Sequence, residues 1–170
     1  MNEEVRVDAD QIHILNVRTL QGNIDCDDAI DNNDVVTHAF AFELENAVDI
    51  ERLVVAFKLK VEIQALNKKQ EQLPAKGSYT HEMVFKVDNL AEFTSAEEKL
   101  LRADMGSVLV GILYSTIRGI IFTRTQGTPL NTVILPIIPP LRLMGMENMK
   151  EEQKGAAENE VKEEKTDKTS

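Results

Sequence analysis

The chain has 170 residues, enough for one domain with a substantial core, and 42% of them are hydrophobic although only 5% are aromatic. The formal net charge of −10 argues against binding to nucleic acid or to an anionic membrane surface. Residues 1–45 hold 11 acidic and two basic residues, so this region either steers basic partners or serves solubility.

The first segment, 1–9, is expected to be a flexible N-terminus. It lacks the basic start and apolar core of a secretory signal peptide, so a cytoplasmic location is expected. Partial alternation over Gln11–Val17 predicts a strand, and the acidic, turn-rich segment Asn23–Asp34 predicts a loop or an irregular edge. The single cysteine, Cys26, cannot form an intramolecular disulfide. The aspartates around it lack the turn glycine and terminal glutamate of a calcium loop, so no metal and no cofactor is expected.

Three further strands are predicted from period-two alternation, over His38–Leu44, Leu53–Leu66 and Tyr79–Val87, with a polar hairpin connection over Asn67–Gly77. In Leu53–Leu66 the apolar and polar side chains alternate throughout, which is typical of an antiparallel sheet with one covered face. The face formed by Phe40, Phe42 and Leu44 is read either as core or as a ligand site. At a sheet edge it could instead receive an unfolded chain.

A long helix is predicted next. Ser95 followed by Glu98 resembles a capping box, a bend is expected near Gly106, and the helix should end at Gly127. Met105–Thr123 carries one charge, Arg118, and its serines, threonines and glycines favour a buried helix of a soluble protein over a membrane span. We expect Arg118 to snorkel or to pair with a carboxylate.

Small residues recur every four positions along this helix, at Ser107, Gly111, Ser115 and Gly119. A helix that is apolar on more than one side needs more cover than one sheet provides. We therefore expect self-association, with this stripe as the oligomer interface.

Beyond the helix, the proline-rich run 130–140 predicts a rigid apolar connection, Leu141–Gln153 predicts a second helix, and 154–170 predicts a disordered acidic tail. Strands followed by helices indicate an α+β fold, with the domain over 10–153. His13, His38 and His81 fall in predicted strands and read as structural. No nucleophile elbow, phosphate loop or metal-ligand spacing is present, so an enzyme is not expected.

The run YSTIRGII at 114–121, then Gly127-Thr128 and LPIIP at 135–139, resembles the long helix and crossover loop of the SecB family, the protein-export chaperones of bacteria. The four preceding strands also look similar, and the resemblance covers roughly Asp10–Met149. It implies a SecB-like α+β protomer that assembles as a dimer of dimers, a homotetramer. It also implies an ATP-independent holdase for unfolded polypeptides, such as secretory preproteins destined for the SecA motor.

The resemblance carries particular residues into roles. It implies client contacts on one strand and on the crossover loop, at Phe40, Phe42, Leu44, Ile134, Leu135, Ile137 and Ile138. It implies motor docking through Glu82 and Asp27, although Thr80 and the long basic hairpin depart from the family pattern. SecB-like proteins also serve toxin–antitoxin systems, so a dedicated chaperone of one partner is an alternative. A small ligand-binding domain or hydrolase is a second alternative.

Overall fold

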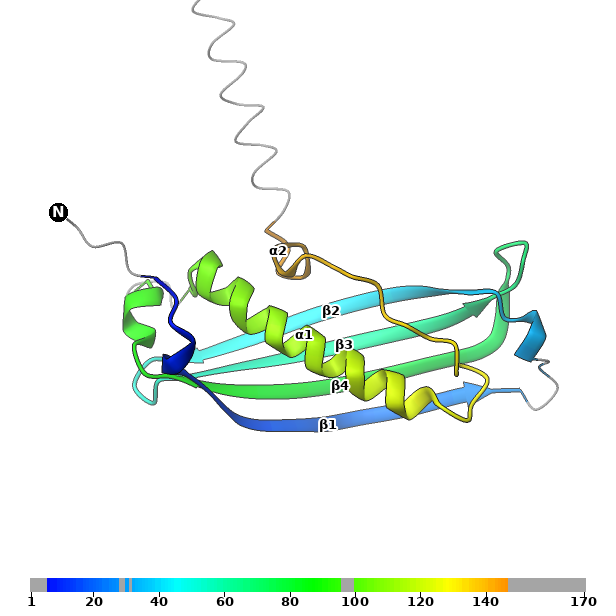
Figure 1. The fold of residues 1–170 in the computed structure, drawn as a ribbon, viewed down its shortest axis with the longest axis horizontal. Coiled ribbons are helices and arrows are strands. Elements are labelled where there is room, and N and C mark those ends of the chain that lie inside the picture. Colours follow the sequence, from blue (N-terminus) through cyan, green and yellow to red (C-terminus); the bar gives the residue numbers. More distant parts are fainter. Residues whose placement is uncertain (1–5, 28–29, 31, 96–99, 147–170) are drawn as a thin grey trace, which may run out of the picture.

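The computed structural model describes residues 6–27, 30, 32–95 and 100–146. Its strands are β1 (Ile12–Cys26), β2 (Thr37–Asp49), β3 (Val54–Leu66) and β4 (Gln72–Val87). Its helices are α1 (Ala103–Thr125) and the short α2 (Pro140–Leu143), with 3-10 turns at Ala9–Gln11, Asn32–Asp34 and Leu90–Phe93. The expected α+β arrangement of four strands, a long helix, a crossover and a second helix is confirmed (Figure 1).

The strands form one antiparallel sheet in the order β1-β4-β3-β2, so β1 and β2 are its edges. The register places Phe42 beside Val61, which lies beside Tyr79 on the next strand. Two bulges insert one extra residue each into β1, Leu15 and Leu20, and both side chains are about half exposed.

Two predicted loops were too long. Asn23–Cys26 belongs to β1 and pairs with residues 75–78 of β4, and the β3–β4 connection is a tight turn that ends before Gln72. The reason is that these strand ends are rich in polar and small residues, with few large apolar side chains such as Ile24 and Leu73, so their alternation is too weak to indicate a strand. Paired backbone groups extend the strands regardless.

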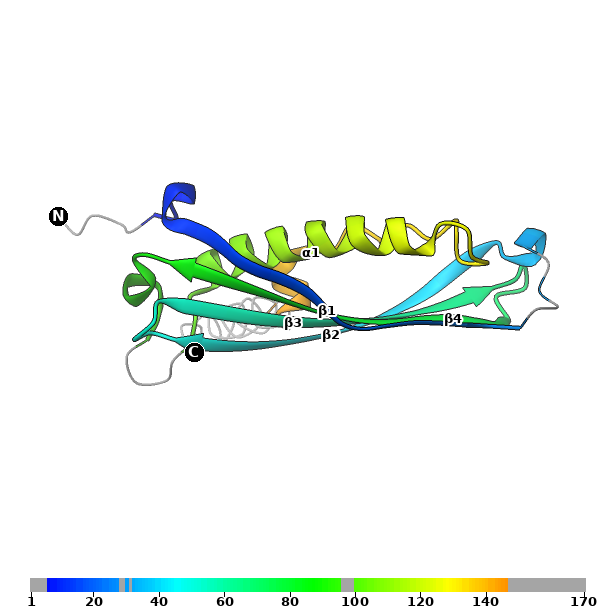
Figure 2. The same cartoon turned by 90° about the horizontal axis from the view of Figure 1, so that it is seen from below.

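One face of the sheet carries the hydrophobic core. The alternating residues of β3 that point to this face are fully or almost fully buried, at Val55, Phe57, Leu59, Val61 and Ile63. Helix α1 lies across the same face, and Figure 2 shows it in edge view with the sheet as a second layer. Among the described residues no helix or strand packs on the opposite, open face.

Helix α1 begins later than the sequence predicts. Thr94 bridges to Leu101, and the Ser95 amide donates to the Leu100 carbonyl at 3.1 Å, so the chain turns back before the helix starts at Ala103. The predicted capping box includes residues 96–99, which lie outside the described residues. The helix is continuous through Gly106, and the predicted bend there is wrong, because the missing Cβ leaves room for Met144.

The end of α1 agrees with the sequence, since Gly127 adopts a left-handed conformation with φ +77° two residues beyond the helix. By length and composition α1 could cross a membrane, with a mean hydropathy of 1.6 in its most apolar window. Core helices pass the same test, and 44% of that window is buried against the rest of the chain. Helix α2 has four residues and ends well before the predicted Gln153, while residues 147–170, including the expected acidic tail, lie outside the described residues.

Candidate functional site

Apolar side chains on edge strand β2 lie at the boundary between core and surface. Phe40, Phe42 and Leu44 all point to the helix-bearing face and are half buried, because no described strand lies on the outer side of β2. The ring of Phe42 packs edge-on against Tyr114 of α1, with ring centroids 5.9 Å apart, and stacks on Phe40 at 6.2 Å. We call Phe40, Phe42 and Leu44 the β2 row. It is anchored to α1 at its middle residue, Phe42, and is open at the edge of the sheet.

The crossover, residues 126–139, runs back alongside α1 over the same face of the sheet (Figure 1). It is tied to the helix by the Tyr114 hydroxyl, which donates to the Pro136 carbonyl at 2.7 Å. Burial raises the pKa of Tyr114 to about 12, so the phenol stays protonated and remains a donor. Since Tyr114 also contacts Phe42, one side chain connects the β2 row to the crossover.

Residues of the crossover differ widely in burial. Leu135 is 1% exposed and packs in the core, whereas Ile134 is 61% and Ile137 86% exposed, and Ile138 is half buried. Of the four crossover residues implied by the family resemblance, Leu135 therefore supports the loop from beneath. Ile134 and Ile137 present apolar surface to the outside.

The small-residue stripe of α1 faces away from the sheet. Ser115 and Gly119 are exposed, and Ser107 and Gly111 are half exposed. A Cβ on Gly119 would have nothing within 4 Å, and one on Gly111 would meet only Pro140 Cγ at 3.7 Å. Ser115 and Gly119 line a hollow of about 390 Å³ between α1 and the crossover, together with Arg118, Phe122 and Ile134.

Arg118 has no carboxylate within ion-pair distance among the described residues, so the expected pairing is not found there. Arg118 is half exposed beside the apolar walls of the hollow. An Arg in this position buries its stem and keeps its charge in water.

The two residues assigned to motor docking are not brought together. Glu82 lies on the open face of the sheet and accepts a hydrogen bond from Arg18 Nε at 2.5 Å, which leaves its side chain 20% exposed. Asp27 follows β1 nine residues beyond Arg18, which at the rise of a strand places it about 30 Å away. The open face carries further ion pairs, including Lys58 with Glu45 at 2.5 Å and Lys60 with Glu62 at 2.8 Å.

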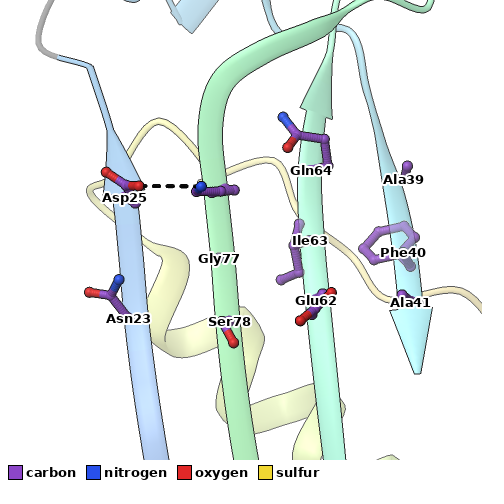
Figure 3. Close-up of a pocket in the computed structure, with 11 residues that line it drawn as sticks. Asn23, Asp25, Ala39, Phe40, Ala41, Glu62, Ile63, Gln64, Gly77 and Ser78 are labelled. Atoms are coloured by element: carbon purple, nitrogen blue, oxygen red, sulfur yellow. Dashed lines mark ion pairs between the residues drawn. The ribbon is translucent and has the colours of Figure 1, made fainter. Parts of the chain in front are cut away.

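The open face also holds a hollow that the sequence did not indicate. It has a volume of about 480 Å³, and its walls include Asn23 and Asp25 from β1 and Glu62 and Gln64 from β3 (Figure 3). Small side chains at Ala39, Ala41 and Ser78 leave the space, at positions where longer residues stand further along the sheet. In the sequence, the only indication of this hollow is the pair of small residues Ala39 and Ala41 on β2.

The three histidines contact neighbouring side chains of the sheet. His13 pairs with Asp88 at 2.9 Å on the surface, and His81 is fully buried, stacked on Tyr79 and hydrogen-bonded to Thr19 at 3.1 Å. Burial, with a smaller effect of Arg124, lowers the pKa of His81 to about 4. Burial raises the pKa of the Cys26 thiol, and in the described part of the chain no cluster of three His, Cys, Asp or Glu residues could hold a metal.

Comparisons with known proteins identify a fold but no family. No protein-family model and no curated protein matches the chain. Eleven chains of solved structures match it. One is the Rv1957 SecB-like chaperone of Mycobacterium tuberculosis, in complex with a ChAD peptide from the Rv1956 HigA1 antitoxin, at a TM-score of 0.57 and 17% sequence identity over 76% of this chain and 92% of that one.

The fold is SecB-like. A second matching structure, a protein of unknown function from Streptococcus agalactiae, has a TM-score of 0.41 and 13% identity over 74% of this chain, a similarity too low to carry an argument. The SecB-like fold accounts for the positions of the β2 row, the crossover and the uncovered helix face on the same side of one sheet.

Proposed function

We propose that this SecB-like protein is a polypeptide-binding chaperone that shields an apolar segment of a dedicated partner protein. The observation that carries the proposal is the half-open row Phe40, Phe42 and Leu44, connected through Tyr114 to a crossover that exposes Ile137. The similarity to a SecB-like chaperone bound to an antitoxin peptide supports it.

The proposed activity requires apolar surface and no reactive side chain. An extended client would bury its apolar side chains against the β2 row and Ile137, at about 25 cal/mol per Å² before the cost of ordering the client. No described strand pairs with the outer edge of β2, so its outward backbone groups could hydrogen-bond such a segment. ATP and cofactors have no role in this mechanism.

The ion pairs of the open face support a dedicated partner over general protein export. Delivery of preproteins to a SecA motor through Glu82 and Asp27 would need an acidic docking surface. Glu82 is instead neutralised by Arg18, and Asp27 lies far along the strand. We keep export as the second candidate because residues 1–45 remain strongly acidic.

We also propose that copies of this chain assemble into an oligomer. The outer side of α1 is apolar at Val108 and Phe122, which are 39% and 48% exposed, and no described segment covers it. A second copy packed on this face would complete the core, and a homotetramer would follow if dimers pair again.

A panel of unrelated denatured proteins, diluted with and without the chaperone, tests the proposal and separates the two candidates. Light scattering should show that a dedicated chaperone protects few of them at equimolar amounts, whereas a general export holdase protects most. If binding assays with apolar peptides and with the whole panel detect no complex, the polypeptide-binding function is wrong.

A further inference from the structure

The short helix α2 lies between the N-terminal half of α1 and the edge strand β2, and it contacts both (Figure 1). Phe42 packs against Tyr114, and from there β2 and α1 run in opposite directions, so Leu44 lies toward the start of α1. Pro140 of α2 is on this same side of Tyr114, since its Cγ lies 3.7 Å from the Cβ position of Gly111. Helix α2 therefore lies beside the Leu44 end of the β2 row and leaves the other end open.

Met144, at the end of α2, holds this helix against α1. Its methyl group fills the gap left by the missing side chain of Gly106, where a Cβ would overlap Met144 Cε and would lie 3.2 Å from Sδ. The fit needs a glycine on one side and a flexible, unbranched side chain on the other. Leu143 and Met144 are half buried against the core, so the same contact removes apolar surface from water.

The segment that carries α2 can move as a unit. The amides of residues 142–146 all donate to carbonyls of residues 139–142, at 2.9 to 3.3 Å, so these backbone hydrogen bonds are internal to the segment. The crossover is fixed as far as Pro136 by the Tyr114 hydroxyl and by the buried Leu135. Residues 137–139 therefore connect a fixed part of the crossover to a part that only side-chain packing is needed to hold.

We infer that α2 is a gate over the Leu44 end of the β2 row, that Met144 in the gap at Gly106 holds the gate closed, and that a bound client segment displaces it. The inference rests on the proposed function and adds how access to its binding surface is regulated. While closed, α2 covers part of an edge strand, which limits pairing with other chains. A client that extends past Phe42 along β2 meets α2, and it gains the contact with Leu44 only when the gate opens.

A substitution at Gly106 tests the gate. Gly106→Ala places a methyl group where Met144 Cε lies, so α2 should be displaced more easily. Gly119→Ala is the matched control, because it makes the same change in the same helix and a Cβ there has no described atom within 4 Å. The probe is a labelled apolar peptide of 13 residues, the length of β2, titrated by fluorescence anisotropy. Gly106→Ala should bind it at least about threefold more tightly than wild type, and Gly119→Ala within about twofold of wild type.

A cross-link tests the opposite effect within one protein. In a chain that carries Cys26→Ser, Gly106→Cys and Met144→Cys, a short bifunctional thiol reagent should join positions 106 and 144, since the Gly106 Cβ position lies 3.2 Å from the Met144 sulfur. The joined protein should bind the same peptide at least about tenfold more weakly than it does before joining. Arg52→Glu, in the β2–β3 turn with its side chain 83% exposed, is a surface control and should bind as wild type does.

The outcomes separate the gate from the proposed function. If neither wild type nor Gly106→Ala binds the peptide, the proposed function and the gate are both wrong. If wild type binds but Gly106→Ala and Gly119→Ala have equal affinity, or if the cross-link leaves binding unchanged, the gate alone is overturned. Weaker binding by Gly106→Ala than by wild type would also overturn it, because α2 would then be part of the binding surface.

Discussion

Burial decides the role of a single side chain in this protein more than its residue type does. Ile137 and Leu135 lie two positions apart on the crossover, yet one is exposed and the other is core. A period-two alternation would place both on the same side, so their opposite burial could not be read from the run LPIIP. The sequence therefore indicates an apolar crossover correctly, and the packing of the loop on the sheet decides which of its residues can meet a client.

His81 should make stability depend on pH. Its pKa is lowered from 6.5 to about 4 in the fold, so the unfolded chain binds more protons between these values. The contribution is complete above pH 6.5 and is lost as pH falls toward 4, by about 3 kcal/mol at about 1.4 kcal/mol per pKa unit. Burial lowers the pKa of His38 as well, which acts in the same direction.

Urea denaturation at several pH values checks this effect. His81→Gln should flatten the loss of unfolding free energy between pH 7 and pH 4. His13→Gln, on the surface beside Asp88, should retain most of the slope. An unchanged slope in His81→Gln would show that the buried imidazole is not its source.

At the scale of elements, the sequence predicts the existence and type of each strand better than its ends. The alternation in β3 is clear because this inner strand has one face against the core and the other toward solvent, so its predicted range is accurate to one residue. β1 and β4 extend beyond their apolar runs by backbone pairing between polar residues such as Asp25 and Lys76. Helix α1 starts at Ala103 because the Arg102 amide donates to the Phe93 carbonyl at 2.7 Å, a contact that local sequence does not encode.

The hydroxyl of Tyr114 should hold the crossover against helix α1. Tyr114→Phe keeps the ring against Phe42 and removes the hydroxyl that donates to Pro136, at a cost of about 1 kcal/mol. We expect faster amide hydrogen exchange in residues 133–138 with little change in the strands. Thr123→Val removes a hydroxyl that bonds within the helix, to the Gly119 carbonyl, and should leave crossover exchange unchanged.

If crossover exchange is the same in Tyr114→Phe and in wild type, the hydroxyl does not tether the loop. Only the contact between the rings of Phe42 and Tyr114 would then connect the β2 row to helix α1, and no described contact would connect it to the crossover.

For the whole molecule, the segregation of strands from helices and the family resemblance led to the fold, and the solved SecB-like structure agrees with it. The sheet order, with β2 at an edge, could not be read from alternation and is what leaves Phe40, Phe42 and Leu44 half open. The ion pairs of the open face were equally hidden, because partners such as Arg18 and Glu82 are 64 residues apart.

The central claim is that the surface formed by the β2 row and the crossover binds unfolded polypeptide. Its most direct test is a fluorescence-anisotropy titration of a labelled apolar peptide with wild type, Ile137→Ser and the control Arg52→Glu. Ile137 is too exposed for its loss to affect folding. We predict saturable binding by wild type and by the control, with at least about fivefold weaker binding by Ile137→Ser at an unchanged melting temperature. Equal affinity in all three proteins, or no binding by wild type, would contradict the account.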